Sequence, residues 1–158
     1  MNKLIVTNTS PLIALSHMQA FDLILQLPFD FVCPEEVAQE IWVGGQKGHP
    51  VSLPQGISVQ KVSQPISPLA LAALDSGEAA VIQLALERQI ETVCIDEIKG
   101  RRAALSVGLK VVGSLGLLGK AKMQGLITEI RPLIEKAQQA GIFYDEHLVN
   151  SFLSSFGE

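Results

Sequence analysis

The sequence predicts an α/β protein with a mostly parallel sheet that helices cover on both faces. Short β-branched runs alternate with longer helical segments along the 158 residues, a pattern typical of parallel sheets. Hydrophobic residues make up 47% of the chain and charged residues 18%, so the chain has enough apolar surface to bury a core. The length favours a single domain that spans residues 1–158.

The first elements follow from local signals near the start of the chain. A β-branched run at 4–6 predicts a buried strand, and the polar run after it predicts a helix with Ser10 as N-cap and Pro11 as first residue. The other elements expected in this half are a weak helix at 19–26, a strand at 29–33, a helix at 34–42, a glycine-rich loop at 43–56 and an edge strand at 57–62.

The second half continues the alternation. Its expected elements are a helix at 68–74, a turn at 75–77, a helix at 78–89, a strand at 92–95, a helix at 98–107, a strand at 110–112 and helices at 114–124, 129–139 and 146–156. The last helix carries Phe152 and Phe156 and is more apolar than one core-facing stripe requires. We therefore expect residues 145–156 to pack on a partner subunit in a homodimer.

Composition excludes several classes of protein. The net charge of −4 and the pI of about 5.4 exclude a uniformly basic surface for nucleic acid. Cys33 and Cys94 are too few for a disulfide framework and are interpreted as free thiols of a cytoplasmic protein. The longest uncharged stretch, 4–21, is interrupted by polar residues and Pro11, so we expect neither a membrane span nor a signal peptide.

Positive charge is concentrated in one segment in spite of the acidic total. Between Glu97 and Glu129 the chain has no acidic residue. The basic residues of this segment are Lys99, Arg101, Arg102, Lys110, Lys120 and Lys122. Such a segment can contact a nucleic-acid backbone, and its structural alternative is a pair of solvated helix faces.

Polar side chains stand where the predicted strands end. Asn8 follows the first strand, Asp96 and Glu97 follow the strand at 92–95, and Glu78 comes directly after the turn at 75–77. In parallel sheets, ligands bind beyond the carboxyl ends of the strands. Clustered oxygen ligands suit Mg²⁺, and metal ions can hold a phosphodiester and activate water for hydrolysis.

Each of these acidic residues also has a structural interpretation. Asp75 and Glu78 match a capping box at the start of a helix. Asp96 has the position of an N-cap for the helix at 98–107. Glu36 and Glu40 have the spacing of a solvated helix face, so only the joint pattern points to a metal site.

Several segments of the chain together match a known pattern. They are VTNTSPLI at 6–13, 34–40, DSGE at 75–78, Asp96-Glu97 with Gly100-Arg101, and 113–127. In this order and spacing they resemble PIN-domain proteins, in particular the prokaryotic branch of predicted nucleic-acid-binding PIN proteins. The segment at 6–13 is similar to the end of the first strand and the small apolar helix of that family, and the resemblance extends over nearly the whole chain.

The resemblance implies a three-layer α/β/α sandwich around a mostly parallel sheet of four or five strands. It also implies a ribonuclease that depends on Mg²⁺ or Mn²⁺ and acts on RNA, and many such proteins are toxins paired with an antitoxin. The family's acidic cluster corresponds here to Asn8, Glu40, Glu78 and Asp96. Residues interpreted as supporting it are Thr9, Ser10 and Glu97, and those interpreted as contacting RNA are Lys99, Arg101 and Arg102.

The sequence departs from the family at its first acidic position, which is Asn8. An amide oxygen can bind Mg²⁺ but carries no charge, so metal affinity should fall. The alternative to a nuclease is therefore a catalytically degenerate PIN fold that binds nucleic acid or a protein partner. A third interpretation, a domain for a small phosphorylated ligand, is disfavoured because no glycine-rich phosphate loop follows the first strand.

Overall fold

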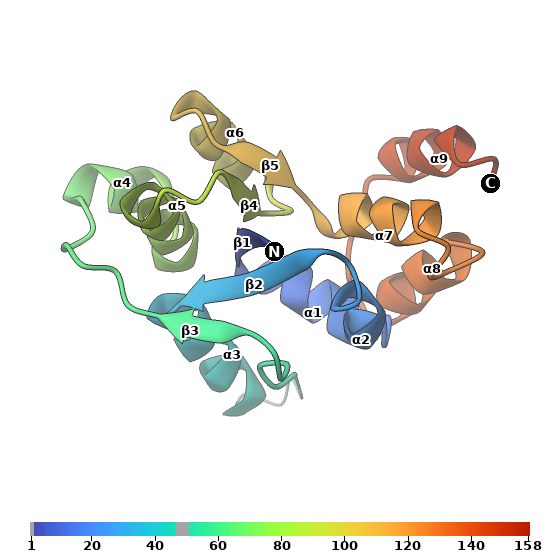
Figure 1. The fold of residues 1–158 in the computed structure, drawn as a ribbon, viewed down its shortest axis with the longest axis horizontal. Coiled ribbons are helices and arrows are strands. Elements are labelled where there is room, and N and C mark those ends of the chain that lie inside the picture. The colour runs from blue at the N-terminus through green and yellow to red at the C-terminus, as the bar shows by residue number, and fades with distance from the viewer. Residues whose placement is uncertain (1, 47–50) are drawn as a thin grey trace.

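The computed structural model describes residues 2–46 and 51–158. Within these residues the strands form one five-stranded, all-parallel sheet in the order β3-β2-β1-β4-β5 (Figure 1). The strands are β1 (Lys3–Thr7), β2 (Phe29–Pro34), β3 (Ser58–Gln60), β4 (Thr92–Cys94) and β5 (Lys110–Val112). The predicted α/β fold class with a parallel sheet is confirmed.

Helices cover both faces of this sheet. They are α1 (Thr9–His17), α2 (Phe21–Ile24), α3 (Glu35–Gln46), α4 (Pro68–Ala73), α5 (Ser76–Arg88), α6 (Ile98–Ser106), α7 (Ser114–Met123), α8 (Arg131–Gln139) and α9 (Glu146–Ser155). Right-handed connections between parallel strands place α1–α3 on one face and α4–α6 on the other. Most contacts agree, because α1 packs on α3, α7 and α8, while α5 packs on α4, α6 and the central strands. Helices α3 and α5 also contact each other across this division.

The central strand is the β-branched run near the start of the chain. Ile5 and Val6 of β1 are buried, and β1 pairs with β2 on one side and β4 on the other. Thr7 pairs with Cys94, so β1 and β4 end side by side. The residues that follow the two strands therefore emerge at the same edge of the sheet.

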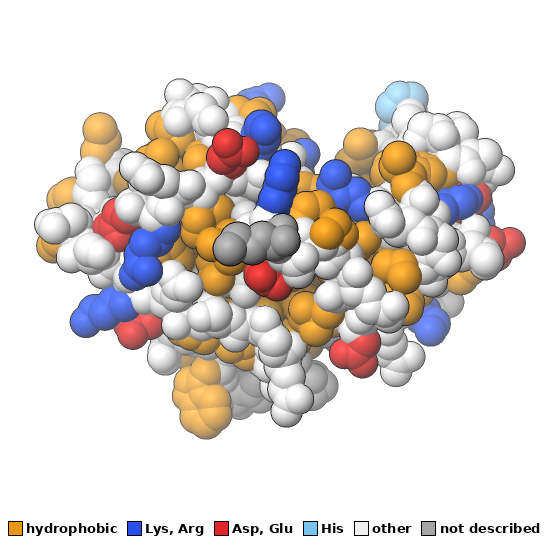
Figure 2. Space-filling view, in the orientation of Figure 1, with side chains coloured by type: hydrophobic (Ala, Val, Ile, Leu, Met, Phe, Trp, Pro, Cys, Tyr) orange, Lys and Arg blue, Asp and Glu red, His pale blue; other side chains and the backbone are white. Residues whose placement is uncertain are grey.

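Figure 2 shows the surface of the molecule from the same side as Figure 1. On this face, acidic side chains lie singly among apolar and polar ones.

Among the described residues, no helix combines the length and the apolar character needed to cross a membrane. Cys33 and Cys94 are both free and buried, as predicted.

Some predicted boundaries are wrong. Helix α1 begins at Thr9 with Asn8 in the N-cap position, so Ser10 is not the N-cap and Pro11 is the third helical residue. Pro11 is tolerated there because the N–H groups of the first turn have no partner within the helix. Ser76 and Gly77, predicted as part of a turn, form the first turn of α5.

The predicted loop at 43–56 also begins too early. Its first residues belong to α3, which continues to Gln46 in spite of the cost of glycine in a helix. Buried Val37 and Ile41 hold α3 against the core, and such packing outweighs local propensity. Residues 47–50 of this predicted loop lie outside the described residues.

The aromatic residues of α9 are used within the chain. A Cβ added to Gly119 of α7 would lie 2.8 Å from Phe156 and 3.3 Å from Phe152. The two rings also contact each other, with centroids 5.1 Å apart. Phe152 and Phe156 therefore contact α7 of the same chain, and a homodimer through residues 145–156 stays a proposal.

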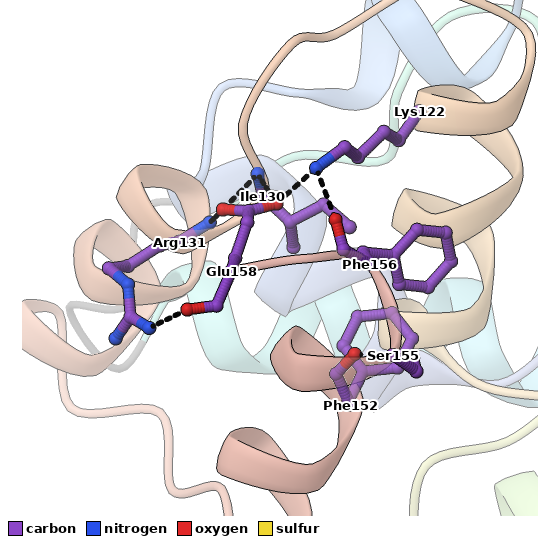
Figure 3. A network of polar contacts seen from close by, with 7 residues as sticks. All are labelled: Lys122, Ile130, Arg131, Phe152, Ser155, Phe156 and Glu158. Carbon is purple, nitrogen blue, oxygen red and sulfur yellow. Dashed lines mark hydrogen bonds and ion pairs between the residues drawn. The ribbon is translucent and has the colours of Figure 1, made fainter.

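Glu158 ties the end of α9 to the start of α8 (Figure 3). Its carboxylate accepts hydrogen bonds from the backbone N–H groups of Ile130 at 2.9 Å and Arg131 at 3.0 Å, and from Lys122 Nζ at 2.8 Å. Ile130 is the N-cap residue of α8 and offers no side-chain cap. Glu158 therefore supplies the anion that the start of this helix requires.

We predict that Glu158→Gln lowers the free energy of unfolding by about 1–2 kcal/mol, because charge-assisted hydrogen bonds are lost from a site that water still reaches. Burial would raise the pKa of Glu158, but its hydrogen bonds to Lys122, Arg131 and Ile130 outweigh burial and lower it to about 2. The stabilisation is therefore present above the unfolded pKa and is lost as the pH falls toward 2. Urea unfolding at several pH values measures this, with exposed Glu135→Gln on α8 as control. Equal stability of the two variants at neutral pH would contradict the prediction.

Candidate functional site

Glu40 is held where α1, α3 and α5 meet. Thr9 Oγ1 donates a hydrogen bond to Glu40 Oε2 at 2.6 Å. A Cβ added to Gly77 would come within 2.9 Å of the Glu40 Cδ atom, so the carboxylate lies directly over the first turn of α5. The structure thus brings Glu40 and Thr9 together at the edge where β1 ends.

Glu78 at the start of α5 has two roles at once. Its Oε1 accepts a hydrogen bond from the Asp75 N–H at 3.3 Å, and its own N–H donates to Asp75 Oδ1 at 2.8 Å, so the capping box is present. Its Oε2 is buried and has no hydrogen-bond partner among the described residues. A Cβ added to Gly100 would lie 2.7 Å from this oxygen, which explains the glycine in the first turn of α6.

Asp75, Glu78 and Glu97 form a compact acidic group. Each offers a carboxylate oxygen, and these oxygens all lie within 4.8 Å of one another. Ser10 Oγ donates a hydrogen bond to Glu97 Oε1 at 2.9 Å and so holds Glu97 in place. The sequence alone indicates Asp75 only as a helix cap, although its N-cap position three residues before Glu78 was a signal for this grouping.

Asn8 brings a second unpartnered oxygen to the same edge. Its side chain is 2% exposed, and Oδ1 has no hydrogen-bond partner within residues 2–46 and 51–158. A buried polar atom without a partner costs about 1–3 kcal/mol. The amide oxygen of Asn8 and the Oε2 atom of Glu78 are hard oxygen donors of the kind that Mg²⁺ and Mn²⁺ bind. This edge therefore suits a divalent cation.

Asp96 is held by the first residue of α7. Ser114 donates to it twice, from its N–H to Oδ1 at 2.7 Å and from its Oγ to Oδ2 at 2.8 Å. The alternative in which Asp96 caps α6 is wrong, because Glu97 has the N-cap position there. Of the predicted metal ligands, only Glu78 belongs to the compact acidic group among the described residues, and Glu40 and Asp96 lie outside it.

The basic residues follow immediately on α6. Lys99 and Arg102 are exposed, whereas Arg101 is partly buried and donates from Nη1 to the Ile95 carbonyl at 2.8 Å. Part of the Arg101 guanidinium is therefore used within the fold. Lys99 and Arg102 remain the better placed of these residues for contact with an anionic ligand.

Burial and mutual repulsion change the acidity of the cluster. Burial raises the pKa of Glu78 to about 7, and the neighbouring charges of Asp75 and Glu97 add to this increase. Burial also raises the pKa values of Glu40 and Asp96, against the hydrogen bonds from Thr9 and Ser114. A bound divalent cation would offset this repulsion.

A cavity of about 660 Å³ adjoins the cluster at Glu40. It lies between α3, the segment after β3 and the start of α5, and Gln39, Val43, Lys61 and Ser76 are among its lining residues. Its volume is within the range of ligand-binding pockets. Of the candidate site residues, Glu40 is the one in this lining, so the cavity meets the site at Glu40.

Comparison with protein families places the chain. The family model DUF3368, described as a PIN domain, matches residues 4–158. The chain belongs to this family, and the PIN-domain resemblance found in the sequence is confirmed. A PIN domain is a nuclease-type module that generally uses divalent metal ions. A search of curated proteins found none that matches the chain.

We predict that the metal-free protein becomes less stable as the pH rises through 7. The pKa of Glu78 is raised on folding, to about 7, so its protonated form stabilises the fold below the unfolded pKa and this stabilisation is lost through pH 7. Glu78→Gln keeps the oxygen that accepts the Asp75 N–H and stays neutral. The free energy of unfolding of Glu78→Gln, relative to that of the parent, should increase by about 1–2 kcal/mol from pH 5 to pH 8. This increase is smaller than the full pKa change implies, because water screens part of the cluster.

Urea unfolding in the presence of a chelator measures this difference. Glu129→Gln, at an exposed position, serves as the control. The difference in free energy of unfolding between this variant and the parent should not change with pH. A constant difference between Glu78→Gln and the parent across this range would contradict the prediction.

Proposed function

We propose that this protein is a metal-dependent ribonuclease of the PIN type that hydrolyses RNA phosphodiester bonds. The observation that supports it most is a pair of buried oxygens without partners, Asn8 Oδ1 and Glu78 Oε2, at one edge of the sheet. Asp75 and Glu97 add carboxylates next to Glu78. Glu40 lies over the first turn of α5 and Asp96 directly precedes Glu97, and each accepts a hydrogen bond from a hydroxyl group. When bound, Mg²⁺ or Mn²⁺ supplies the positive charge that activates water and stabilises the phosphate as it is attacked.

The proposal gives each side chain a role. Glu40, Glu78 and Asp96 hold the metal, and Asn8 adds a neutral ligand or orients water. Further negative charge comes from Asp75 and Glu97. Hydroxyl groups hold the carboxylates in place, from Thr9 to Glu40 and from Ser10 to Glu97.

RNA would approach from the side of α6. Lys99 and Arg102 would contact its phosphates, with a smaller contribution from Arg101 because of its bond to Ile95. The proposal includes the cytoplasm as the site of action and a role as a toxin with an antitoxin partner. A small DNA-binding reading frame next to the gene would support the toxin role, and analytical ultracentrifugation would test a homodimer.

One observation favours a second candidate function, a degenerate PIN fold that binds nucleic acid or a protein without cleavage. Asn8 replaces a charged ligand with a neutral one at the centre of the edge. Fewer anionic ligands weaken the binding of a divalent cation. The two functions are distinguished by metal binding and RNA cleavage in the same preparation.

We predict that Glu78→Gln weakens Mn²⁺ binding at least about tenfold and removes RNA cleavage, because one anionic ligand is lost. Asn8→Asp should tighten Mn²⁺ binding by about tenfold and raise cleavage, since the two side chains are nearly isosteric and only the charge changes. Adding Asp96→Asn should remove that gain. Calorimetry and a labelled-RNA assay measure both effects, with Glu146→Gln on α9 as control. A parent and an Asn8→Asp variant that both fail to bind Mn²⁺ would leave the binding module as the function.

A further prediction concerns salt. Each phosphate contact on single-stranded RNA adds about −0.7 to the slope of log affinity against log salt. Arg102→Ala and Lys99→Ala should each flatten this slope by about that amount, and Arg101→Ala by less. Lys136→Ala on α8 is the matched control and should leave the slope unchanged. Equal slopes for all variants would place the RNA on another surface.

A further inference from the structure

The series of hydrogen bonds that begins at Asp96 continues beyond Ser114. The Ser114 Oγ atom also lies 2.7 Å from the Tyr144 hydroxyl, which belongs to the connection between α8 and α9. Tyr144 is separated from Ser114 by 30 residues and Ser114 from Asp96 by 18. Neither Ser114 nor Tyr144 was a candidate site residue in the sequence analysis.

We propose that Tyr144 is a positioning residue for the nuclease site, acting through the Ser114 hydroxyl to fix the carboxylate of Asp96. This inference rests on the proposed function, because it concerns the affinity of the same site for metal. It assigns a role to the α8–α9 connection, which contributes none of the proposed metal ligands.

The direction of the hydrogen bonds supports this role. An ionised carboxylate only accepts hydrogen bonds, so both the N–H and the O–H of Ser114 must donate to Asp96. Once its proton points to Asp96, Ser114 Oγ has only lone pairs to offer. Tyr144 must then donate its proton to Ser114 Oγ, which orients the serine hydroxyl toward Asp96.

The chain around Tyr144 is anchored on both sides. The N–H of Ile142 donates to the Ala137 carbonyl at 3.0 Å, and Asp145 caps α9 by accepting from the Leu148 N–H at 2.9 Å. The Tyr144 ring itself packs against the core. The hydroxyl is therefore presented from a fixed backbone, as a positioning group requires.

The space around Asp96 is equally restricted. Ser114 is fully buried, and a Cβ added to Gly113 would lie 2.7 Å from Asp96 Oδ1 and 2.9 Å from Arg101 Nη1. Each carboxylate oxygen accepts one hydrogen bond from Ser114 and keeps a second lone pair for a cation. Groups that orient a metal ligand in this way change metal affinity or activity by about 10–100-fold when they are removed.

The decisive variant is Tyr144→Phe, which removes only the hydroxyl and keeps the packed ring. We expect Mn²⁺ to bind about 3–10-fold more weakly to it, and 10–100-fold more weakly to Ser114→Ala. In the double variant, the tyrosine change should add less than about twofold, because Tyr144 acts only through Ser114. The control is Ser106→Ala, which removes an exposed serine hydroxyl bonded to the Ala103 carbonyl on α6.

Calorimetry with Mn²⁺ alone measures affinity, and thermal unfolding with a chelator reports stability separately. A lower unfolding temperature with unchanged Mn²⁺ affinity in Tyr144→Phe would mean a purely structural role and overturn the inference. Additive effects of the two substitutions on Mn²⁺ affinity in the double variant would also overturn the inference. If the parent binds Mn²⁺ and cleaves RNA, and Tyr144→Phe has the same Mn²⁺ affinity as the parent, only this inference fails. A parent that binds no Mn²⁺ overturns the proposed function and this inference together.

Discussion

The pairing of β1 with β4 is the contact on which the candidate site depends. The two parallel strands are in register from Ile5 opposite Thr92 to Thr7 opposite Cys94, and the Asn8 N–H extends the ladder to the Cys94 carbonyl at 2.9 Å. Because parallel strands end at the same edge, the residues after β1 and after β4 emerge together. A register shift of one residue would turn side chains to the opposite face of the sheet and separate these residues.

Close approach of acidic side chains to glycines is the second structural condition. A Cβ at each of these glycines would collide with a carboxylate, and the pairs are Gly77 with Glu40, Gly100 with Glu78, and Gly113 with Asp96. Gly77 and Gly100 lie in helices, where glycine costs about 1 kcal/mol relative to alanine. The fold accepts this cost because the carboxylates occupy the space that a side chain would take.

The acidic residues also show that capping a helix need not use a whole carboxylate. A carboxylate has two oxygens, and Glu78 uses Oε1 for its capping box while Oε2 stays buried without a partner in the described part of the chain. The hydroxyl groups of Thr9 and Ser10 donate their hydrogen bonds to Glu40 and Glu97, respectively. The result is an anionic cluster whose carboxylates are oriented by the protein and whose mutual repulsion a bound cation would offset.

The sequence by itself determined the class of fold and the place of most candidate residues along it. The alternation of short β-branched runs with helices depends on local periodicity, so it predicts the parallel sheet without knowledge of any contact. Residues such as Asn8 and Asp96 could be placed at strand ends for the same reason. Helix limits such as the start of α1 were missed, since packing and not local preference sets them.

Only the tertiary structure decided which side chains meet. The grouping of Asp75 with Glu97 depends on the crossover from β3 across the sheet to β4, and the link from Asp96 to Tyr144 depends on how the α8–α9 connection packs on α7. Phe156 was assigned to a partner surface because its apolar character is visible in the sequence, but Gly119, the residue that receives it, is not adjacent to it there. Local patterns indicate the secondary structure and the burial that a residue prefers. Contacts between distant elements follow from the packing of the whole chain.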